Sequence, residues 1–345
     1  MPSVSRVLHY SRRMVCVLMF AAGTFASGPA AADDAPARCQ GKDMLAEMQA
    51  TKPDLYAKVM AESRALSNTE AMLWKVEKPG VGTSYLFGTM HLSDPRIAEL
   101  PSAAIEAIAH SKSVALEVAD LSPEAVGAAM TKAAKLIIYT DGQSLRRVLS
   151  DDDYNKVQDI VMKSGMPGEF AAVMKPWLVS MLLATSDCER KQVASGKAVL
   201  DLRIAAEAQK NGIAVTGLET IDSQLSALAS IADDQQLAIL KVELDYADRA
   251  DDMMETMVQM YQKRQIGAAM PFQLALAAES GAPPSTFDGF KKALLMDRNA
   301  KMRDAALPLF ENGNAFVAVG ALHLPGSAGL VALLRESGYT VTPIE

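Results

Sequence analysis

Two of the four histidines in this sequence lie in the same short pattern. Residues 87–92 read Phe-Gly-Thr-Met-His-Leu and residues 319–324 read Val-Gly-Ala-Leu-His-Leu, so an apolar run is followed each time by Gly-x-x-His-Leu. A glycine where a strand ends lets the backbone turn sharply, and the imidazole then points over the carboxyl edge of the sheet, where open α/β sheets bind ligands. Beside a carboxylate, His91 and His323 would form a metal site with open positions for water.

Two glutamates are candidates for that carboxylate. Glu117 closes the apolar run 113–118, and Glu219 follows the apolar run 213–218. An acid buried at the end of such a run costs free energy unless it has a partner. Both are therefore candidates for a metal ligand or a general base, with Glu117 ranked first.

Two further polar residues, Asp94 and Arg298, have two interpretations each. Asp94, three residues after His91, either orients that imidazole or caps the next helix. Arg298, in a helix before the second histidine motif, either holds a substrate carboxylate or an oxyanion or is an exposed surface arginine. His110 falls near the end of a predicted helix, where contact with the helix dipole is the simpler role.

The elements around these residues predict an α/β fold. Short apolar or alternating runs predict strands, the first two forming a hairpin, at residues 72–76, 84–88, 113–118, 213–218, 315–319 and 339–344. Helical spacing predicts helices at residues 41–67 with an interruption at Pro53, and at 101–110, 124–135, 144–148, 151–163, 176–185, 200–210, 223–269, 287–307 and 327–337. Strands 213–218 and 113–118 read as buried, and the last sixty residues read as a βαβ-like unit.

We therefore expect a central mixed sheet covered by helices, with an α+β arrangement as the alternative. Helices from about residue 121 to 270 form an insertion or cap between the two Gly-x-x-His halves. Residues 33–345 form a single domain, because no linker rich in Pro, Gly or Ser divides them.

The first 32 residues are typical of a signal peptide. Three arginines (Arg6, Arg12 and Arg13) precede the apolar run 14–26 and the small residues 30–32, and no acid is present. The run is too short for a stable membrane anchor. Ordinary Sec export is favoured over the twin-arginine route, and we expect a periplasmic or secreted protein.

The net charge argues against nucleic-acid binding, and the cysteine content indicates an oxidising compartment. The chain has 34 Lys and Arg against 41 Asp and Glu, and cleavage after residue 32 would change the net charge from −7 to −10. Without a basic field, nucleic-acid binding is not expected. The two cysteines left after cleavage, Cys39 and Cys188, predict a disulfide in an oxidising compartment, with two free buried thiols as the alternative.

Six segments together resemble the TraB/GumN family. They are residues 85–91, Leu116-Glu117, Lys175-Pro176-Trp177, residues 217–220, Asp297-Arg298-Asn299 and residues 316–326. This family is similar to the Tiki proteins, membrane-tethered metalloproteases that cut Wnt N-termini, and is distantly similar to erythromycin-esterase and ChaN-type folds, the latter linked to haem or iron. The resemblance implies a divalent metal such as manganese or cobalt, with zinc also compatible, and matches His91, His323 and Glu117 to the family's motif residues.

The resulting hypothesis is a metal-dependent hydrolase, most readily a peptidase acting on a peptide or protein substrate. His91, His323 and Glu117 hold the ion, whose bound water attacks a carbonyl group. Glu117 or Glu219 acts as the base and Arg298 stabilises the negative charge that develops. One alternative is a periplasmic protein that binds haem, metal or a peptide without turnover, and another is a structural partner of an export or polysaccharide system.

Overall fold

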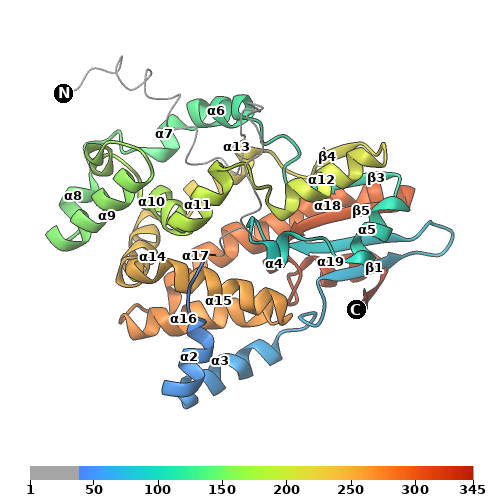
Figure 1. Ribbon diagram of the computed structural model, residues 1–345, viewed down its shortest axis with the longest axis horizontal. Coiled ribbons are helices and arrows are strands. Elements are labelled where there is room, and N and C mark those ends of the chain that lie inside the picture. Colours follow the sequence, from blue (N-terminus) through green and yellow to red (C-terminus); the bar gives the residue numbers. More distant parts are fainter. Residues whose placement is uncertain (1–38, 345) are drawn as a thin grey trace, which may run out of the picture.

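Six strands form one mixed sheet in the order β4-β3-β5-β2-β1-β6 (Figure 1). The structure is a computed structural model that describes residues 39–344, so the predicted signal peptide lies outside the described residues. The strands are β1 (Leu73–Glu77), β2 (Ser84–Thr89), β3 (Ser113–Leu116), β4 (Val215–Gly217), β5 (Ala315–Gly320) and β6 (Thr340–Ile344). Strands β4, β3, β5 and β2 are parallel, whereas β1 is antiparallel to both of its neighbours. This confirms the predicted mixed sheet and the β1–β2 hairpin.

Most of the remaining described chain is helical. The α-helices are α2 (Met44–Thr51), α3 (Pro53–Ala65), α4 (Pro95–Ala98), α5 (Ser102–Ala109), α6 (Pro123–Lys132), α7 (Ala134–Ile137), α8 (Leu145–Val148), α9 (Asp151–Lys163), α10 (Pro176–Leu183), α11 (Asp187–Ala194), α12 (Leu200–Lys210), α13 (Ile221–Ala229), α14 (Asp233–Asp245), α15 (Ala250–Gln262), α16 (Ala269–Glu279), α17 (Asp288–Phe290), α18 (Asp297–Asn312) and α19 (Leu330–Glu336). Pro53 and Pro176 each open a helix at its first turn, where the missing N–H leaves no bond unmade. Within residues 39–344, no helix is both long and apolar enough to cross a membrane.

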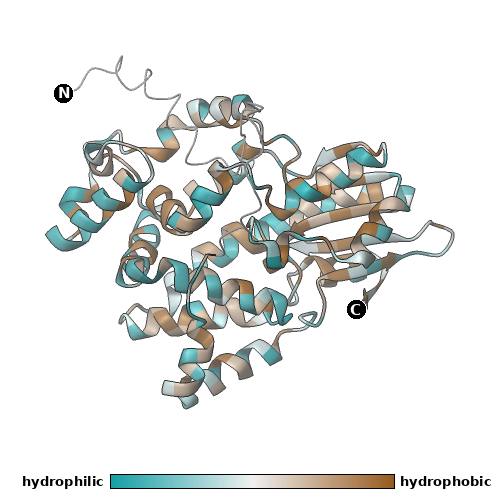
Figure 2. Cartoon of the chain, viewed as in Figure 1, coloured by the Kyte–Doolittle hydropathy of each residue, from teal (hydrophilic) through white to brown (hydrophobic). Residues whose placement is uncertain are grey.

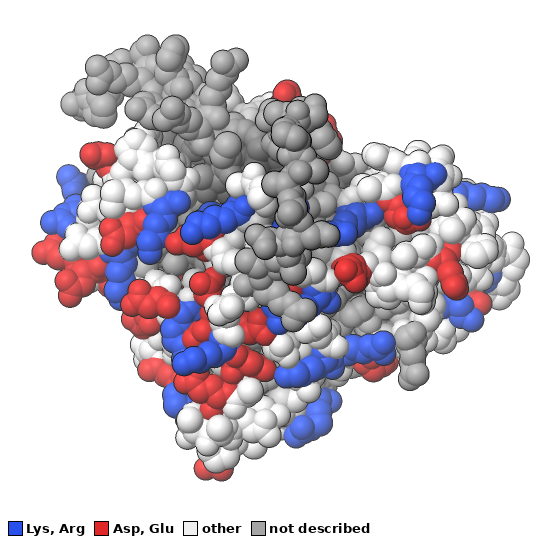
Figure 3. Space-filling view, viewed as in Figure 1, with Lys and Arg blue, Asp and Glu red and all other residues white. Residues whose placement is uncertain are grey.

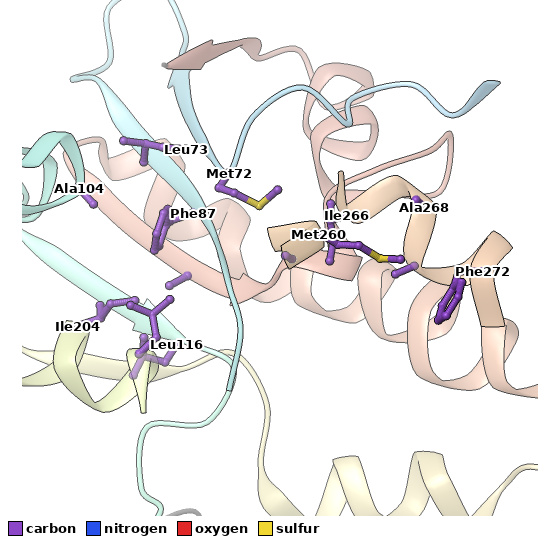
Figure 4. Close-up of a cluster of buried hydrophobic side chains, with 14 of the residues drawn as sticks. Met72, Leu73, Phe87, Ala104, Leu116, Ile204, Met260, Ile266, Ala268 and Phe272 are labelled. Atoms are coloured by element: carbon purple, nitrogen blue, oxygen red, sulfur yellow. The ribbon is translucent and has the colours of Figure 1, made fainter. Parts of the chain in front are cut away.

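Helices cover both faces of the sheet because side chains alternate along each strand. In β5, Phe316 and Ala318 pack with α5 and α12 on one face, whereas Val317 and Val319 pack with α18 and α19 on the other. Figure 4 shows part of the first cluster, with Ala104 of α5, Ile204 of α12 and Phe87 of β2. The strands are accordingly the brown, hydrophobic part of the right-hand half in Figure 2. Each fully buried apolar side chain of this kind stabilises the fold by about 1.5–3 kcal/mol, so the sheet is held rigidly between two helical layers.

Several helices between β3 and β5 pack around a second core. It is formed mainly by α6, α9, α10, α13 and α14, at the left in Figure 1. We call this group the cap helices. From the same stretch of sequence, however, α12 and β4 belong to the layers of the sheet. The division into one domain with an insertion at about residues 121–270 stays a prediction.

Two local predictions were wrong. Strand β4 is an edge strand, paired only with β3, and Thr216 and Gly217 are exposed rather than buried. The predicted helix 287–307 is divided by a π-helical turn at Lys291–Met296, after which α18 runs on to Asn312. Strand β6 pairs with β1 at the edge of the sheet and runs parallel to β5, from which β2 and β1 separate it.

Charged side chains of both signs are interspersed on the face shown in Figure 3. Many form surface ion pairs between neighbouring turns or helices, such as Arg249 with Glu47 and Asp252. Pairs of this exposure each contribute little to stability, about 0–1 kcal/mol. The buried polar groups are therefore the stronger candidates for a functional site.

The predicted disulfide between Cys39 and Cys188 is present. It joins the segment before α2 to α11, across a sequence separation of 149 residues. Next to Cys188, the Glu189 carboxylate accepts a 2.6 Å hydrogen bond from the backbone N–H of Ser93, two residues after His91. The cross-link therefore fastens the helix that supports the loop of the first histidine motif.

We expect Cys188→Ser to lower the free energy of unfolding by about 2–5 kcal/mol, because the unfolded chain regains the freedom of a long loop. Denaturant unfolding of the oxidised protein and the variant measures the difference. As a control, a reductant should destabilise the wild-type protein to the same extent and leave Cys188→Ser unchanged. Equal stability of all samples would contradict the expectation.

A buried acid in the cap helices predicts a pH-dependent stability. Burial raises the pKa of Glu243 in α14 to about 7, and the nearby Ser180 hydroxyl opposes this only in part. Between its ordinary pKa near 4.5 and about 7, the unfolded state loses this proton while the folded state keeps it. The folded state binds more protons in this window, so its stability falls as pH rises.

We expect Glu243→Gln to remove this fall, and so to stabilise the protein at pH 8 relative to pH 5 by about 1–3 kcal/mol compared with wild type. Denaturant unfolding at the two pH values measures it. Asp245→Asn, at the exposed end of the same helix, is the matched control and should keep the wild-type pH dependence. A parallel pH dependence of Glu243→Gln and wild type would refute the assignment.

Candidate active site

Four of the residues selected from the sequence follow the ends of four adjacent parallel strands. Glu219 comes after β4, Glu117 directly after β3, and the two motif histidines after β5 and β2. Parallel strands end at one edge of the sheet, and that edge is where ligands bind in such folds. Strands β4, β3, β5 and β2 lie side by side (Figure 1), and the structure thus brings Glu219, Glu117, His323 and His91 to one edge of the sheet.

Glu117 lies at the centre of this group and is buried. Its Oε1 accepts a 2.6 Å hydrogen bond from the backbone N–H of Gly320 and lies 3.6 Å from His323 Nε2. Its Oε2 accepts from Arg298 Nη2 at 2.6 Å and from Gln224 Nε2 at 3.0 Å. Both oxygens therefore have defined partners, which compensate for the burial of the acid.

Arg298 joins the two glutamates. It donates to Glu219 Oε2 from Nε at 2.9 Å and from Nη2 at 2.7 Å, besides its bond to Glu117. The side chains of Arg298 and Glu219 are only 12% and 4% exposed. Arg298 therefore points to the same edge as the histidines and is not an exposed surface arginine. It pairs with both Glu117 and Glu219, and its predicted role in stabilising a developing negative charge stays a prediction.

His91 is held by an aspartate of α12. Its Nδ1 lies 2.8 Å from Asp201 Oδ2, and the Thr89 hydroxyl donates to Asp201 Oδ1 at 2.9 Å. The charge of Asp201 raises the pKa of His91 to about 9, against the opposing effect of burial. Because 47% of the His91 side chain is exposed, water screens part of this attraction.

His323 is buried and is held by an amide. Its Nδ1 lies 2.6 Å from Asn299 Oδ1, and Asn299 Nδ2 donates to the Ala328 carbonyl at 2.7 Å, which fixes the orientation of the amide. Burial lowers the pKa of His323 to about 4, although the charge of Glu117 raises it. The neutral ring then carries its proton on Nδ1 and turns the lone pair of Nε2 toward Glu117.

Glu117 itself is ionised. Burial raises its pKa, but the coupling to His323, the charges of His91 and Arg298, and the Gly320 N–H together outweigh burial and lower the pKa to about 2. A carboxylate and a neutral imidazole therefore face each other at 3.6 Å, each with a lone pair toward the other. Such a pair of acceptors is suited to a cation or a donated proton between them.

The two motif glycines serve close packing and not a turn. Neither Gly88 nor Gly320 has a positive φ, which corrects our expectation. A methyl group on Gly88 would lie 2.6 Å from Leu324 Cδ1. One on Gly320 would lie 3.2 Å from Glu117 Oε1, 3.5 Å from His323 Cδ2 and 3.5 Å from His91 Nε2. The three candidate ligands thus surround one open point beside Gly320.

The donor chemistry at this point fits a divalent ion. Both imidazoles have Nδ1 bonded to an acceptor, and such bonds orient metal-binding histidines and leave Nε2 for the ion. However, no group of three His, Cys, Asp or Glu side chains in residues 39–344 is positioned to coordinate one ion. The three predicted ligands thus lie near one point beside Gly320 but are not positioned to coordinate a single ion.

Two other sequence candidates lie apart from this chemistry. Asp94 caps α4, its Oδ1 accepting from the Arg96 N–H at 2.9 Å, and it forms an ion pair with Arg96. This supports the cap interpretation of Asp94. His110 ends α5, where its Nδ1 lies 2.7 Å from the Glu106 carbonyl, as expected for a residue at the helix end.

Three residues of the site were not selected from the sequence. Asp201 is a buried acid on the apolar start of α12, a signal that could have been used. Asn299 is adjacent to Arg298, and the π-helical turn directly precedes both. Such turns are frequent at functional sites, but neither the turn nor the contacts of Gln224 have a clear signature in a single sequence.

Comparison with known proteins identifies relatives over most of the chain. A family model described as the TraB/PrgY/gumN family matches residues 72–343, a range that includes every residue of the site. The uncharacterized protein YbaP of Escherichia coli (strain K12) is 23% identical over 257 residues, which cover 74% of this chain and 89% of that protein.

Two animal proteins match at similar identity. Metalloprotease TIKI2 of Danio rerio is 25% identical over 316 residues, 79% of this chain and 60% of that protein. A metalloprotease TIKI homolog of Nematostella vectensis is 21% identical over 327 residues, 81% of this chain and 68% of that protein. No solved structure gives a significant match.

Proposed function

Since the chain belongs to the TraB/PrgY/gumN family, we propose that it is a metal-dependent hydrolase, and specifically a peptidase. Two of its relatives are named metalloproteases, and their similarity extends over about four fifths of this chain. The observation that carries the proposal is the meeting of His91, His323 and Glu117 around the open point beside Gly320. Two oriented imidazoles and a buried carboxylate are the ligands that metallohydrolases use.

His91, His323 and Glu117 would hold the ion, which we propose to be manganese, cobalt or zinc, since imidazole and carboxylate ligands suit all three. Such an ion acidifies a bound water and polarises a carbonyl oxygen. Asp201 and Asn299 orient the two rings through their Nδ1 atoms. With Nδ1 engaged on each ring, Nε2 is the atom that each histidine would offer to the ion.

Glu117 is also our first choice for the group that accepts a proton from the attacking water. It is ionised at neutral pH and faces the histidines, whereas Glu219 lies on the far side of Arg298 as part of its ion pair. Arg298 holds both carboxylates in position. The Gly320 N–H, 2.6 Å from Glu117 Oε1, fixes the carboxylate from the other strand end.

An exported location is part of the proposal. The Cys39–Cys188 disulfide supports it, because such bonds form and persist in oxidising compartments. We propose cleavage of a signal peptide near residue 32 and release to the periplasm or outside the cell. N-terminal sequencing of the protein from the exported fraction tests this.

Binding without turnover is the second candidate, favoured by the unassembled ligand set. One experiment separates the two. The purified protein is analysed for bound metal and is then incubated with a peptide library, with chelator, and with chelator followed by Mn²⁺, Co²⁺ or Zn²⁺. Cleavage read by mass spectrometry should vanish with chelator and return with one of the ions.

Variants identify the site in the same assay. His91→Ala and His323→Ala should lose both metal and cleavage, whereas His110→Ala, the matched control outside the site, should keep both. Bound metal without cleavage of any peptide would support binding alone. Cleavage that continues in the presence of chelator would contradict the metal-dependent proposal.

A further inference from the structure

A cavity of about 300 Å³ adjoins the site, and its polar and apolar linings come from different parts of the fold. The polar lining comes from the sheet edge, α12 and α18, and includes His91, Glu117, Asp201 and Arg298. The apolar lining comes largely from the cap helices, with Val126 and Met130 of α6, Met181 of α10, and Ile221, Leu225 and Leu228 of α13. The polar residues of the candidate active site and the apolar side chains of the cap helices thus line the same cavity.

The apolar wall is built into a core. Val126, Met130 and Leu225 are themselves buried members of the cap-helix core, and Met181, Ile221 and Leu228 pack against it. The wall is therefore a fixed surface of the cap and not a set of loose side chains. Its two methionines can adapt to the shape of an apolar ligand.

The charged groups of the cavity are already paired. His91 is bonded to Asp201, and Arg298 pairs with both Glu117 and Glu219. Among the described residues, the cap-helix wall itself offers no charged side chain, so a charged substrate side chain placed against it would lose its hydration without gaining a counter-charge. An apolar side chain would instead be transferred from water to an apolar wall, which is favourable.

We propose that this cavity binds an apolar side chain next to the bond that is attacked, so that the substrates are peptides with a large aliphatic or aromatic residue at that position. The inference rests on the proposed function. The volume is at the lower end of the range for ligand pockets, about 300–1,000 Å³. It is therefore suited to one side chain and its flanking atoms and not to a long peptide segment.

The test uses peptides of one alanine-based sequence in which a single position is Gly, Leu, Phe, Lys or Glu. Cleavage is measured by mass spectrometry, and binding is measured by fluorescence anisotropy of the labelled peptides. We expect Leu and Phe to exceed Gly, Lys and Glu by about tenfold to a hundredfold. The same series is repeated with variants that fill the cavity.

Leu228→Trp on α13 and Leu121→Trp in the loop before α6 fill the cavity from two different elements. Leu237→Trp is the matched control, because Leu237 packs against the same core and does not line the cavity. Thermal unfolding establishes that each variant is folded, and two filling variants guard against the loss of one. The filling variants should lose the preference for Leu and Phe, and Leu237→Trp should keep it.

The outcomes separate this inference from the proposed function. Cleavage without apolar preference, or with a preference that both folded filling variants retain, overturns the inference and leaves the hydrolase standing. A second outcome is that no peptide is cleaved, but apolar peptides bind selectively and the filling variants abolish this binding. It would support the cavity assignment and contradict the hydrolase proposal. Neither cleavage nor selective binding overturns both.

Discussion

Replacing Glu117 with glutamine is expected to lower kcat on a cleavable peptide by about 10²–10⁴-fold, the usual contribution of a positioned general base. The amide has nearly the same shape and can still accept from the Gly320 N–H. It no longer accepts a proton, and it removes the negative charge that faces His323 and Arg298. Steady-state kinetics with the metal-loaded protein measures the loss.

Glu219→Gln is the matched control for this prediction. Glu219 shares Arg298 with Glu117, and Gln224 Nε2 contacts both at 3.4 Å and 3.0 Å. The two variants therefore disturb the same ion-pair network, and only Glu117 has an oxygen facing a histidine. We expect Glu219→Gln to cost less than tenfold. A larger loss than for Glu117→Gln would reverse the roles of the two glutamates.

Arg298→Met is expected to destabilise the folded protein by about 3–5 kcal/mol, because it leaves two buried carboxylates without their counter-charge. Glu117 and Glu219 lose three hydrogen bonds from the guanidinium between them. Methionine fills a similar volume, so lost packing contributes little. Denaturant unfolding at neutral pH measures the change.

Two comparisons make the Arg298 prediction specific. Arg303→Met changes an arginine of the same helix that pairs with its exposed neighbour Asp304, and should stay within about 0.5 kcal/mol of wild type. The double variant Arg298→Met/Glu219→Gln should recover part of the loss by removing one unpaired charge. A loss below about 1 kcal/mol for Arg298→Met would mean that water replaces the guanidinium.

The sequence predicts that the site residues meet because each one follows its own short apolar run, and parallel strands all end at the same edge of a sheet. Each candidate, His91, His323, Glu117 and Glu219, follows a short apolar run, and parallel strands carry such run ends to one edge. The sheet class followed from the alternation of strands and helices. No distance between side chains was needed for this step.

The contacts that the sequence does not predict are those that depend on how helices pack against the sheet edge. Asp201 and Gln224 reach the site from α12 and α13, and periodicity shows which face of a helix is apolar but not where a polar side chain ends. Strand β4 is exposed because it lies at the edge of the sheet. The sequence of a strand does not show which strands lie beside it.

Gly320 shows that a functional position can be defined by what is missing from it. Its backbone conformation is open to any L-residue, yet one added carbon would occupy the point shared by His91, His323 and Glu117. Glycine at this position therefore keeps that point free of a side chain. A search for related sites that scores only histidines and acids would overlook this residue, whereas a requirement for glycine at the end of the strand before the second histidine would include it.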